Sequence, residues 1–250
     1  MDLLADPFTI AMAVVAVFIL GLAKGGFAGL GVLATPVMAL ALPPVTAAAL
    51  LLPVLIVQDV VSIWSFRKTW DRWIVAWMLP GAFAGVVLAA LFAASVEERQ
   101  VLLMLGTITL AFGIVRLWTE RGGRIAAASN SPGWVGTLFG VATGFTSQIA
   151  HAGGPPFQMW VTPRRLPHQT FVGTQSVLFA LINWMKVPSY LAIGSLNRQT
   201  LTAAALLLPL AVATTLVAVR VIRRLDTARF YTMVYLLMVV LGAKLVWDGL

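Results

Sequence analysis

The stretches GLAKGGFAGLGVLATP (residues 21–36) and GVATGFTSQIAHAGGP (residues 140–155) decide the architecture of this 250-residue chain. Each is a glycine-rich interruption inside apolar sequence, and the two align at an offset of 119 residues. At that offset three landmarks of the first stretch fall on three of the second: Gly21 on Gly140, Gly25 on Gly144 and Pro36 on Pro155. Interrupted apolar segments at equivalent places in two halves of a membrane protein are typical of a transport site.

The composition is that of a polytopic α-helical membrane protein. Hydrophobic residues make up 60% of the chain and charged residues only 10%, with a mean hydropathy of +0.94, whereas soluble domains carry about 25% charged residues. Apolar runs such as residues 47–66 and 74–96 match the roughly 20 residues that a helix needs to cross the bilayer. These runs lack the strict alternation of membrane β-strands. We therefore predict an all-α fold that spans the lipid bilayer.

Charge and cysteine content exclude several classes of partner and chemistry. The net charge is +8, but the basic residues lie mostly between apolar segments, where cytoplasmic loops collect them. Topology thus explains the charge, and no nucleic acid is predicted as a partner. The chain has no cysteine, which excludes thiolate catalysis and Cys-based metal sites; we predict no metal and no cofactor. Residues 1–6 lack the basic region of a signal peptide, so the first apolar segment is expected to be retained.

A second offset, of 129 residues, extends the duplication toward the end of each half. It aligns Pro80 with Pro209, Gly113 with Gly242 and Trp118 with Trp247. We predict a first membrane repeat over residues 1–118, a polar connector over residues 119–132, and a second membrane repeat over residues 133–250. The alternative is a chance alignment of apolar strings, which the ordered match of glycine, proline and tryptophan disfavours.

Each predicted repeat contains five apolar segments. They are residues 8–23, 28–42, 45–66, 73–94 and 100–118, then residues 133–146, 154–161, 169–193, 199–222 and 227–248. The first two of each repeat are short, since 15 helical residues reach only about 22 Å. We expect broken or re-entrant short helices there, which survive at membrane depth only when buried in protein or lining a cavity.

The basic loops predict the relative orientation of the two repeats. Lysine and arginine gather at residues 67–72 in the first half and at residues 220–229 in the second, whereas residues 97–99 and 194–199 carry one arginine each. Because basic loops face the cytoplasm, equivalent loops lie on opposite faces of the membrane. The expected fold is therefore two inverted-topology repeats with both termini outside.

The two breaks supply the candidate substrate-binding residues. Glycine lets the backbone approach a ligand, and a helix that begins after a break offers unpaired amides and a positive dipole end to an anion. The predicted set is Lys24, Gly25, Gly26, Phe27, Gly29, Gly31, Thr146, Ser147, Gln148, His151, Gly153 and Gly154, with Thr174 and Gln175 from a later polar run. The alternative for any single glycine is close packing of neighbouring helices.

Few ionisable residues interrupt the apolar segments, and such charges are candidates for function. Lys24 could attract an anion or extend to the membrane surface, while His151 could carry a proton, contact the substrate or bond a carbonyl as a structural group. Asp59, Asn183 and Lys186 form a second candidate group. Within it we expect an ion pair between Asp59 and Lys186, with a proton-coupling role for Asp59 as the alternative.

The motifs GGFxGxG at residues 25–31 and GFxSxxxxxGGPP at residues 144–156 resemble those of the TauE/SafE family of sulfite and organosulfonate exporters. The resemblance covers almost the whole length of the chain. It implies a multi-pass protein of the bacterial inner membrane that moves small anions, such as sulfite, sulfoacetate and related C2 or C3 sulfur compounds, out of the cell.

Together these observations predict a secondary transporter that exports a small anion by alternating access. Ion-gradient coupling is expected, with a coupling proton as a candidate partner, and a homodimer is kept as an alternative to a monomer. The rival functions are an anion channel that uses the same cavity and an intramembrane enzyme. No catalytic residue is predicted, because the sequence lacks a pair of metal-binding histidines, a cysteine nucleophile and neighbouring membrane carboxylates.

Overall fold

The computed structural model is all-helical over the residues that it describes, which are 3–27, 29–93, 97–120, 122, 130–221 and 228–250. The helices are α1 (Pro7–Gly25), η1 (Leu30–Leu33), α2 (Ala34–Met38), α3 (Pro44–Phe66), α4 (Arg72–Ala93), α5 (Glu98–Glu120), α6 (Gly133–Ala150), α7 (Gly154–Val161), η2 (Thr162–Arg164), α8 (His168–Ala192), α9 (Arg198–Val221) and α10 (Ala228–Gly249). Residue 28, most of the predicted connector 119–132 and residues 222–227 of the second basic loop lie outside the described residues.

Five helices of the described chain are long and apolar enough to cross a membrane. They cover Pro7–Gly25, Pro44–Phe66, Arg72–Phe92, Arg99–Thr119 and Arg198–Arg220. This confirms the predicted all-helical, multi-pass membrane protein. Two expectations are wrong: α6 covers 18 residues, Gly133–Ala150, rather than the short segment 133–146, and the first segment of the chain is not short either. The Asp6 side chain caps α1, accepting from the Thr9 amide at 3.0 Å, and this helix continues through Lys24 to Gly25. Its 19 residues reach about 28 Å.

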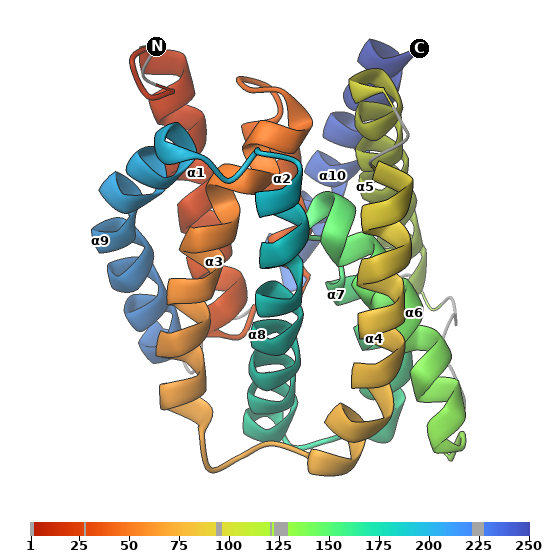
Figure 1. The fold of residues 1–250 in the computed structure, drawn as a ribbon. Helices are drawn as coiled ribbons and strands as arrows, with labels where there is room; N and C mark the ends of the chain where they lie inside the picture. Colours follow the sequence, from red (N-terminus) through yellow and green to blue (C-terminus); the bar gives the residue numbers. More distant parts are fainter. Residues whose placement is uncertain (1–2, 28, 94–96, 121, 123–129, 222–227) are drawn as a thin grey trace.

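Each glycine-rich break reverses the direction of the chain. After α1, the backbone adopts positive φ at Gly26 and Gly29, and η1 and α2 then pack back against α1. After α6, the reversal is made at His151, with φ 52°, and α7 packs back against α6. Both breaks are thus the tips of helical hairpins, which Figure 1 shows as α1 with α2 and α6 with α7.

The long helices run in both directions between two ends of the molecule (Figure 1). Helices α1, α3, α5 and α9 run away from the end where both termini lie, and α4, α6, α8 and α10 run back toward it. The loop between α3 and α4, which carries Arg67 and Lys68, lies at the opposite end. The basic loop between α3 and α4 and the chain termini are therefore at different ends of the bundle.

Four of the aligned glycines let helices of the two halves approach closely. A Cβ on Gly21 would lie 2.2 Å from Thr214 Oγ1 of α9, and one on Gly144 would lie 2.0 Å from the Ala82 carbonyl oxygen of α4. Gly25 meets Ala218 of α9 in the same way, and Gly140 meets Met78 of α4. Helix α1 thus packs against α9 while α6 packs against α4, and α5 packs against α10.

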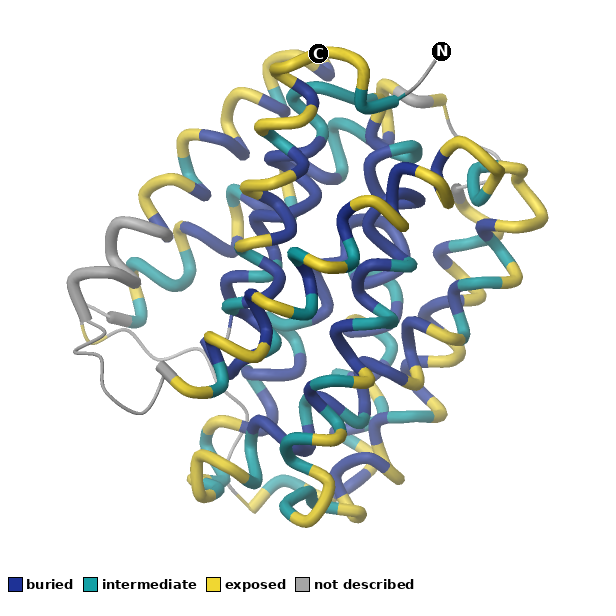
Figure 2. The backbone as a smooth tube through the Cα atoms, turned by 90° about the vertical axis from the view of Figure 1, so that its left-hand side faces the viewer, coloured by how far each residue is buried: buried dark blue, intermediate teal, exposed yellow. Residues whose placement is uncertain are grey.

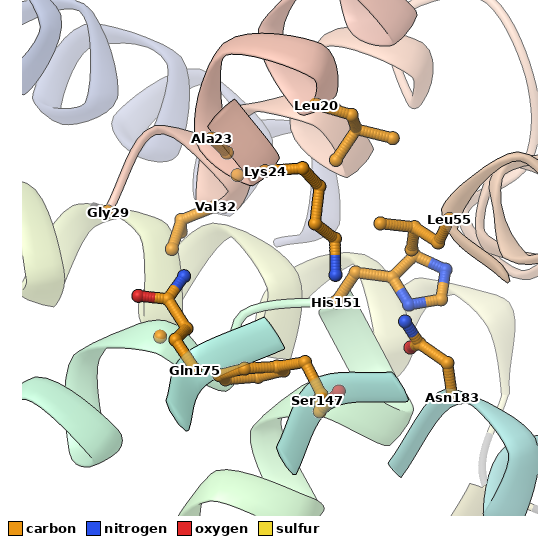
Figure 3. A pocket seen from close by; sticks show the side chains of 13 residues that line it. Leu20, Ala23, Lys24, Gly29, Val32, Leu55, Ser147, His151, Gln175 and Asn183 are labelled. Atoms are coloured by element: carbon orange, nitrogen blue, oxygen red, sulfur yellow. The ribbon is translucent and has the colours of Figure 1, made fainter. Parts of the chain in front are cut away.

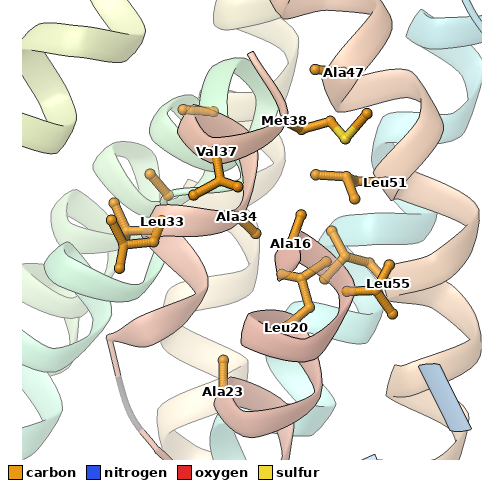
Figure 4. Close-up of a cluster of buried hydrophobic side chains, with 14 of the residues drawn as sticks. Ala16, Leu20, Ala23, Leu33, Ala34, Val37, Met38, Ala47, Leu51 and Leu55 are labelled. Atoms are coloured by element: carbon orange, nitrogen blue, oxygen red, sulfur yellow. The ribbon is translucent and has the colours of Figure 1, made fainter. Parts of the chain in front are cut away.

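The core lies between the helices, and large apolar side chains cover the outside of the bundle. Figure 2 shows buried positions on the inner faces and exposed ones around the periphery. Among the exposed side chains are Trp64, Leu91, Leu206 and Val240, each more than 60% exposed. Figure 4 shows part of the core, where apolar side chains of α1, α2 and α3 meet. An apolar outer surface of this extent is suited to lipid rather than water.

The base of the second hairpin is fixed by an aromatic and cationic cluster. Arg164 stacks over the rings of Trp160 and Trp73, with centroid distances of 4.3 and 4.8 Å, and its Nη2 donates to the Ser131 carbonyl at 2.7 Å. Trp160 Nε1 donates to Ser131 Oγ at 3.0 Å. Desolvation lowers the pKa of the Arg164 guanidinium, an effect that Asp71 opposes. The cluster ties the end of α7 to the start of α6.

Candidate functional site

The tips of the two hairpins face a shared cavity of about 50 Å³, lined by both polar and apolar side chains (Figure 3). The residues that line it are Lys24, Gly29 and Gly31 from the first break, Ser147, His151 and Gly154 from the second, Gln175, Phe179 and Asn183 from α8, and the apolar residues Leu20, Ala23, Val32 and Leu55. A space of this size holds a few water molecules or one small solute.

One side of the cavity contains an ion pair. The Lys24 ammonium donates to Asp59 Oδ1, and Asn183 Nδ2 donates to Asp59 Oδ2 at 2.6 Å, so both carboxylate oxygens are engaged. The Lys24 Nζ atom also lies 5.7 Å from the centre of the Phe179 ring. The expected pair between Asp59 and Lys186 is not formed. Lys186 is one helical turn beyond Asn183, and Asp59 is paired instead with Lys24 at the end of α1.

The other side contains a second cation, Lys186, which has no carboxylate partner among the described residues. Its Nζ atom lies 2.6 Å from His151 Nδ1, 3.2 Å from the Ser147 carbonyl oxygen and 3.3 Å from Ser147 Oγ. His151 Nε2 lies 2.9 Å from the Ala48 carbonyl oxygen. A carbonyl only accepts, so Nε2 carries the proton and Nδ1 accepts from the lysine.

The charges around the cavity do not balance. With both side chains protonated, the ammonium groups of Lys24 and Lys186 outnumber the one carboxylate, of Asp59, and Lys186 is fully buried with 0% of its surface exposed. A buried charge without a counter-charge is costly. One small anion in the cavity would supply the missing charge. The described residues contain no group of three or more His, Cys, Asp or Glu that could hold a metal ion.

His151 is held in a backbone conformation that few residues other than glycine adopt. Its φ of 52° lies in the left-handed region. Its two ring nitrogens connect Ala48 of α3 to Lys186 of α8. Strain of this kind persists where the surroundings over-determine it, often at functional sites. The side chain thus joins the second break to helices of both halves.

The structure places about half of the predicted site residues on the cavity. Lys24, Gly29, Gly31, Ser147, His151, Gly154, Gln175 and Asn183 line it, and Asp59 and Lys186 bond to members of this group.

The remaining candidates have other surroundings. Gly25 packs against α9, Gly26 ends α1, Phe27 is buried in the core, and Gly153 faces Phe179 and the Thr143 carbonyl. Thr146 and Thr174 donate to carbonyls of their own helices, and Gln148 donates to Ser189 Oγ at 2.8 Å. Polarity and nearness to a break do not by themselves decide which face of a helix a residue occupies.

Sequence reasoning missed two residues next to the cavity. Phe179 lies on α8 between Gln175 and Asn183 at a spacing of four residues, so helical periodicity identifies it as part of the same face. Gln158 of α7 is 5% exposed, and its Nε2 atom lies near both Gly29 and Gly154. Its position four residues after Gly154 gives it the same face of α7 as that glycine.

Comparison with known proteins gives one match. The model of the family described as "Sulfite exporter TauE/SafE" matches residues 13–245, which include both hairpin tips and all the residues around the cavity. The searches of curated proteins and of solved structures return no match. The family comprises membrane transporters that export sulfite and related anions. The match covers most of the chain, and the chain belongs to the sulfite exporter TauE/SafE family.

Proposed function

We propose that this protein is a secondary transporter that exports one small anion, sulfite or a C2 or C3 organosulfonate such as sulfoacetate, across the inner membrane of a bacterium. The observation that carries the proposal is the cavity between the two hairpin tips, where two lysines face one aspartate. An anion offsets the positive charge of these lysines. The potential of a bacterial membrane, negative inside, also favours exit of an anion, by about 2.3 kcal/mol per charge at 100 mV.

We further infer that the two halves, residues 1–118 and 133–250, are inverted-topology repeats. In support, the corresponding helices run in opposite directions in Figure 1: α1 and α6, α3 and α8, α4 and α9, and α5 and α10. The corresponding contacts also agree, since α1 packs against α9 and α6 packs against α4. On this assignment the two hairpins are re-entrant, each entering the bilayer from its own side.

The positive-inside rule then orients the protein. Arg67, Lys68 and Arg72 lie around the loop that is farthest from the termini, and Arg164 and Arg165 lie just before α8, which begins at the same end. Basic residues of this kind mark the cytoplasmic side. The termini accordingly lie outside.

Different contacts lie on the two sides of the cavity, one toward each end of the bundle, as alternating access requires. Toward the termini, His151 bonds to Ala48 near the start of α3. Toward the basic end, the hydroxyl groups of Ser62 on α3 and Ser176 on α8 lie 2.6 Å apart. We assign these contacts as the outer and inner gates of an occluded state. In export, the inner gate opens to load the anion while the outer gate is closed. The outer gate then opens only after the inner gate has closed.

A coupling proton has its best candidate carrier in the hydrogen bond between His151 and Lys186, because both side chains can gain or lose a proton and both lie beside the cavity. Asp59 is a weaker candidate, since Lys24 and Asn183 occupy both of its oxygens. A homodimer stays a prediction, because lipid alone accounts for the apolar outer surface.

Transport by purified protein in liposomes tests the proposal. Vesicles are loaded in turn with sulfite, sulfoacetate, taurine, sulfate and acetate, and efflux is followed under an inside-negative potential. Saturable efflux with counterflow of sulfite or sulfoacetate is expected. Flux that is linear in concentration, with single-channel currents, would identify a channel instead. Chemical conversion of a substrate by the protein would identify an enzyme.

A further inference from the structure

Helix α7 begins at the cavity but offers it few backbone donors. Its first residue, Gly154, lines the cavity, and the next two are Pro155 and Pro156, which have no amide hydrogen. The Phe157 amide donates to the Gly153 carbonyl at 3.4 Å. The start of α7 therefore lacks most of the free amides through which a helix N-terminus usually binds an anion.

The side chain of Gln158 provides a donor at the same place. Gln158 is 95% buried, with 5% of its surface exposed, and its Nε2 atom has no hydrogen-bond partner. Buried amide groups are normally satisfied by protein or water. The same atom lies 3.7 Å from the position of a Cβ on Gly154 and 3.5 Å from that of a Cβ on Gly29. It is therefore aimed at the point where the two hairpin tips meet.

Both glycines leave space between this donor and the cavity. Gly29 adopts a φ of 94°, which side chains rarely allow, and both Gly29 and Gly154 line the cavity. A Cβ at either position would stand next to Gln158 Nε2. The opposite side of the cavity holds Lys24 and His151, so the two sides differ in chemistry: one is cationic and the other presents a neutral amide.

We propose that the side-chain amide of Gln158 is a second, uncharged donor of the anion site, which binds an oxygen of the substrate in the gap between Gly29 and Gly154. The proposal rests on the proposed function and adds a specificity-determining residue to it. The ligand chemistry is that of an oxyanion with two or more oxygens. One oxygen faces the lysine and histidine side, and another accepts from Gln158. A spherical halide reaches one side only.

Thermal unfolding of the purified protein in detergent, titrated with sodium sulfite and separately with sodium chloride, tests this assignment. Gln158→Leu removes the donor and leaves an apolar side chain that is one atom shorter and of similar volume. Its unfolding midpoint without sulfite is expected to equal or exceed that of the wild type, because an unpaired buried donor has been removed. Its apparent Kd for sulfite is expected to rise at least fivefold, and Gln158→Glu is expected to show no sulfite-induced shift.

Gln58→Leu is the matched control. Gln58 is also buried, but its Nε2 atom donates to the Val17 and Ala211 carbonyls at 3.4 Å, so this variant should unfold earlier and bind sulfite as the wild type does. Wild-type sulfite affinity in Gln158→Leu overturns the inference and leaves the proposed function intact. A lower midpoint with unchanged affinity, which assigns Gln158 a structural role, overturns it as well. If the wild type shows no shift with any oxyanion, the proposed function fails together with the inference.

Discussion

Lys186 is the residue whose surroundings are hardest to explain without a bound anion. It is fully buried, and its nearest polar atoms belong to His151 and Ser147, which are not anions. Replacing a buried ion pair by apolar groups of similar size is often neutral or stabilising, and an unpaired buried charge lacks even the attraction of a partner. A charge retained at such a position is therefore better explained by function than by stability.

Lys186→Met is expected to weaken sulfite binding by tenfold or more, since it removes the unbalanced positive charge. The unfolding midpoint without ligand should stay at or above that of the wild type. Sulfite-dependent thermal shifts measure both quantities. Lys244→Met is the control, because Lys244 pairs with Asp248 on the exposed surface, and this variant should leave both quantities unchanged. Normal sulfite affinity in Lys186→Met would remove that lysine from the site.

Lys24→Met tests the ion pair with Asp59. The single change leaves a carboxylate buried without its cation, since the Asp59 side chain is 3% exposed, and breaking such a pair costs about 3–5 kcal/mol. The double variant Lys24→Met/Asp59→Asn removes both charges and should recover most of this loss. Chemical unfolding in detergent gives the two free energies of unfolding. A single variant as stable as the wild type would show that the pair is not buried in the protein.

At the scale of helices, the contacts of the aligned glycines support the repeat assignment. Gly144 and Gly25 are equivalent in the alignment, and each faces the fourth segment of the opposite half, α4 and α9 respectively. Gly144→Ala and Gly25→Ala should therefore destabilise the protein by similar amounts, about 1–3 kcal/mol each, as the helices must separate. Gly194→Asn serves as the control, because nothing lies within 4 Å of a Cβ there and Asn tolerates its φ of 69°. Wild-type stability in Gly144→Ala would contradict the close approach of α6 and α4.

Sequence patterns anticipate the elements better than they anticipate the site. The long segments are predicted to within a few residues, as for residues 45–66 against Pro44–Phe66, because apolar length and capping residues are local properties. The partner of Asp59 was predicted wrongly, because the contact of α1 with α3 and α8 depends on how the first hairpin folds. Gln158 was missed for a similar reason: its importance comes from Gly29, which lies 129 residues away in the sequence and belongs to the other half.

The orientation of the whole molecule is open to a simple labelling experiment. The chain has no cysteine, so Lys68→Cys and Gln199→Cys each carry one thiol, at exposed positions at opposite ends of the bundle. A membrane-impermeant thiol reagent applied to intact cells should label Gln199→Cys, and it should label Lys68→Cys only after permeabilisation. The reverse pattern would place the termini in the cytoplasm and contradict the proposed direction of the gates.

The central claim is that a small oxyanion binds where the two hairpin tips meet. Selenite is the heavier analogue of sulfite, and an experimental structure with selenite locates the ion by the anomalous scattering of selenium. The expected result is one selenium peak in the cavity between Lys24, His151 and Gly154, with an oxygen about 3 Å from Gln158 Nε2, the usual hydrogen-bond length. An empty cavity at saturating selenite, or a peak that lies elsewhere in the protein, would contradict the account.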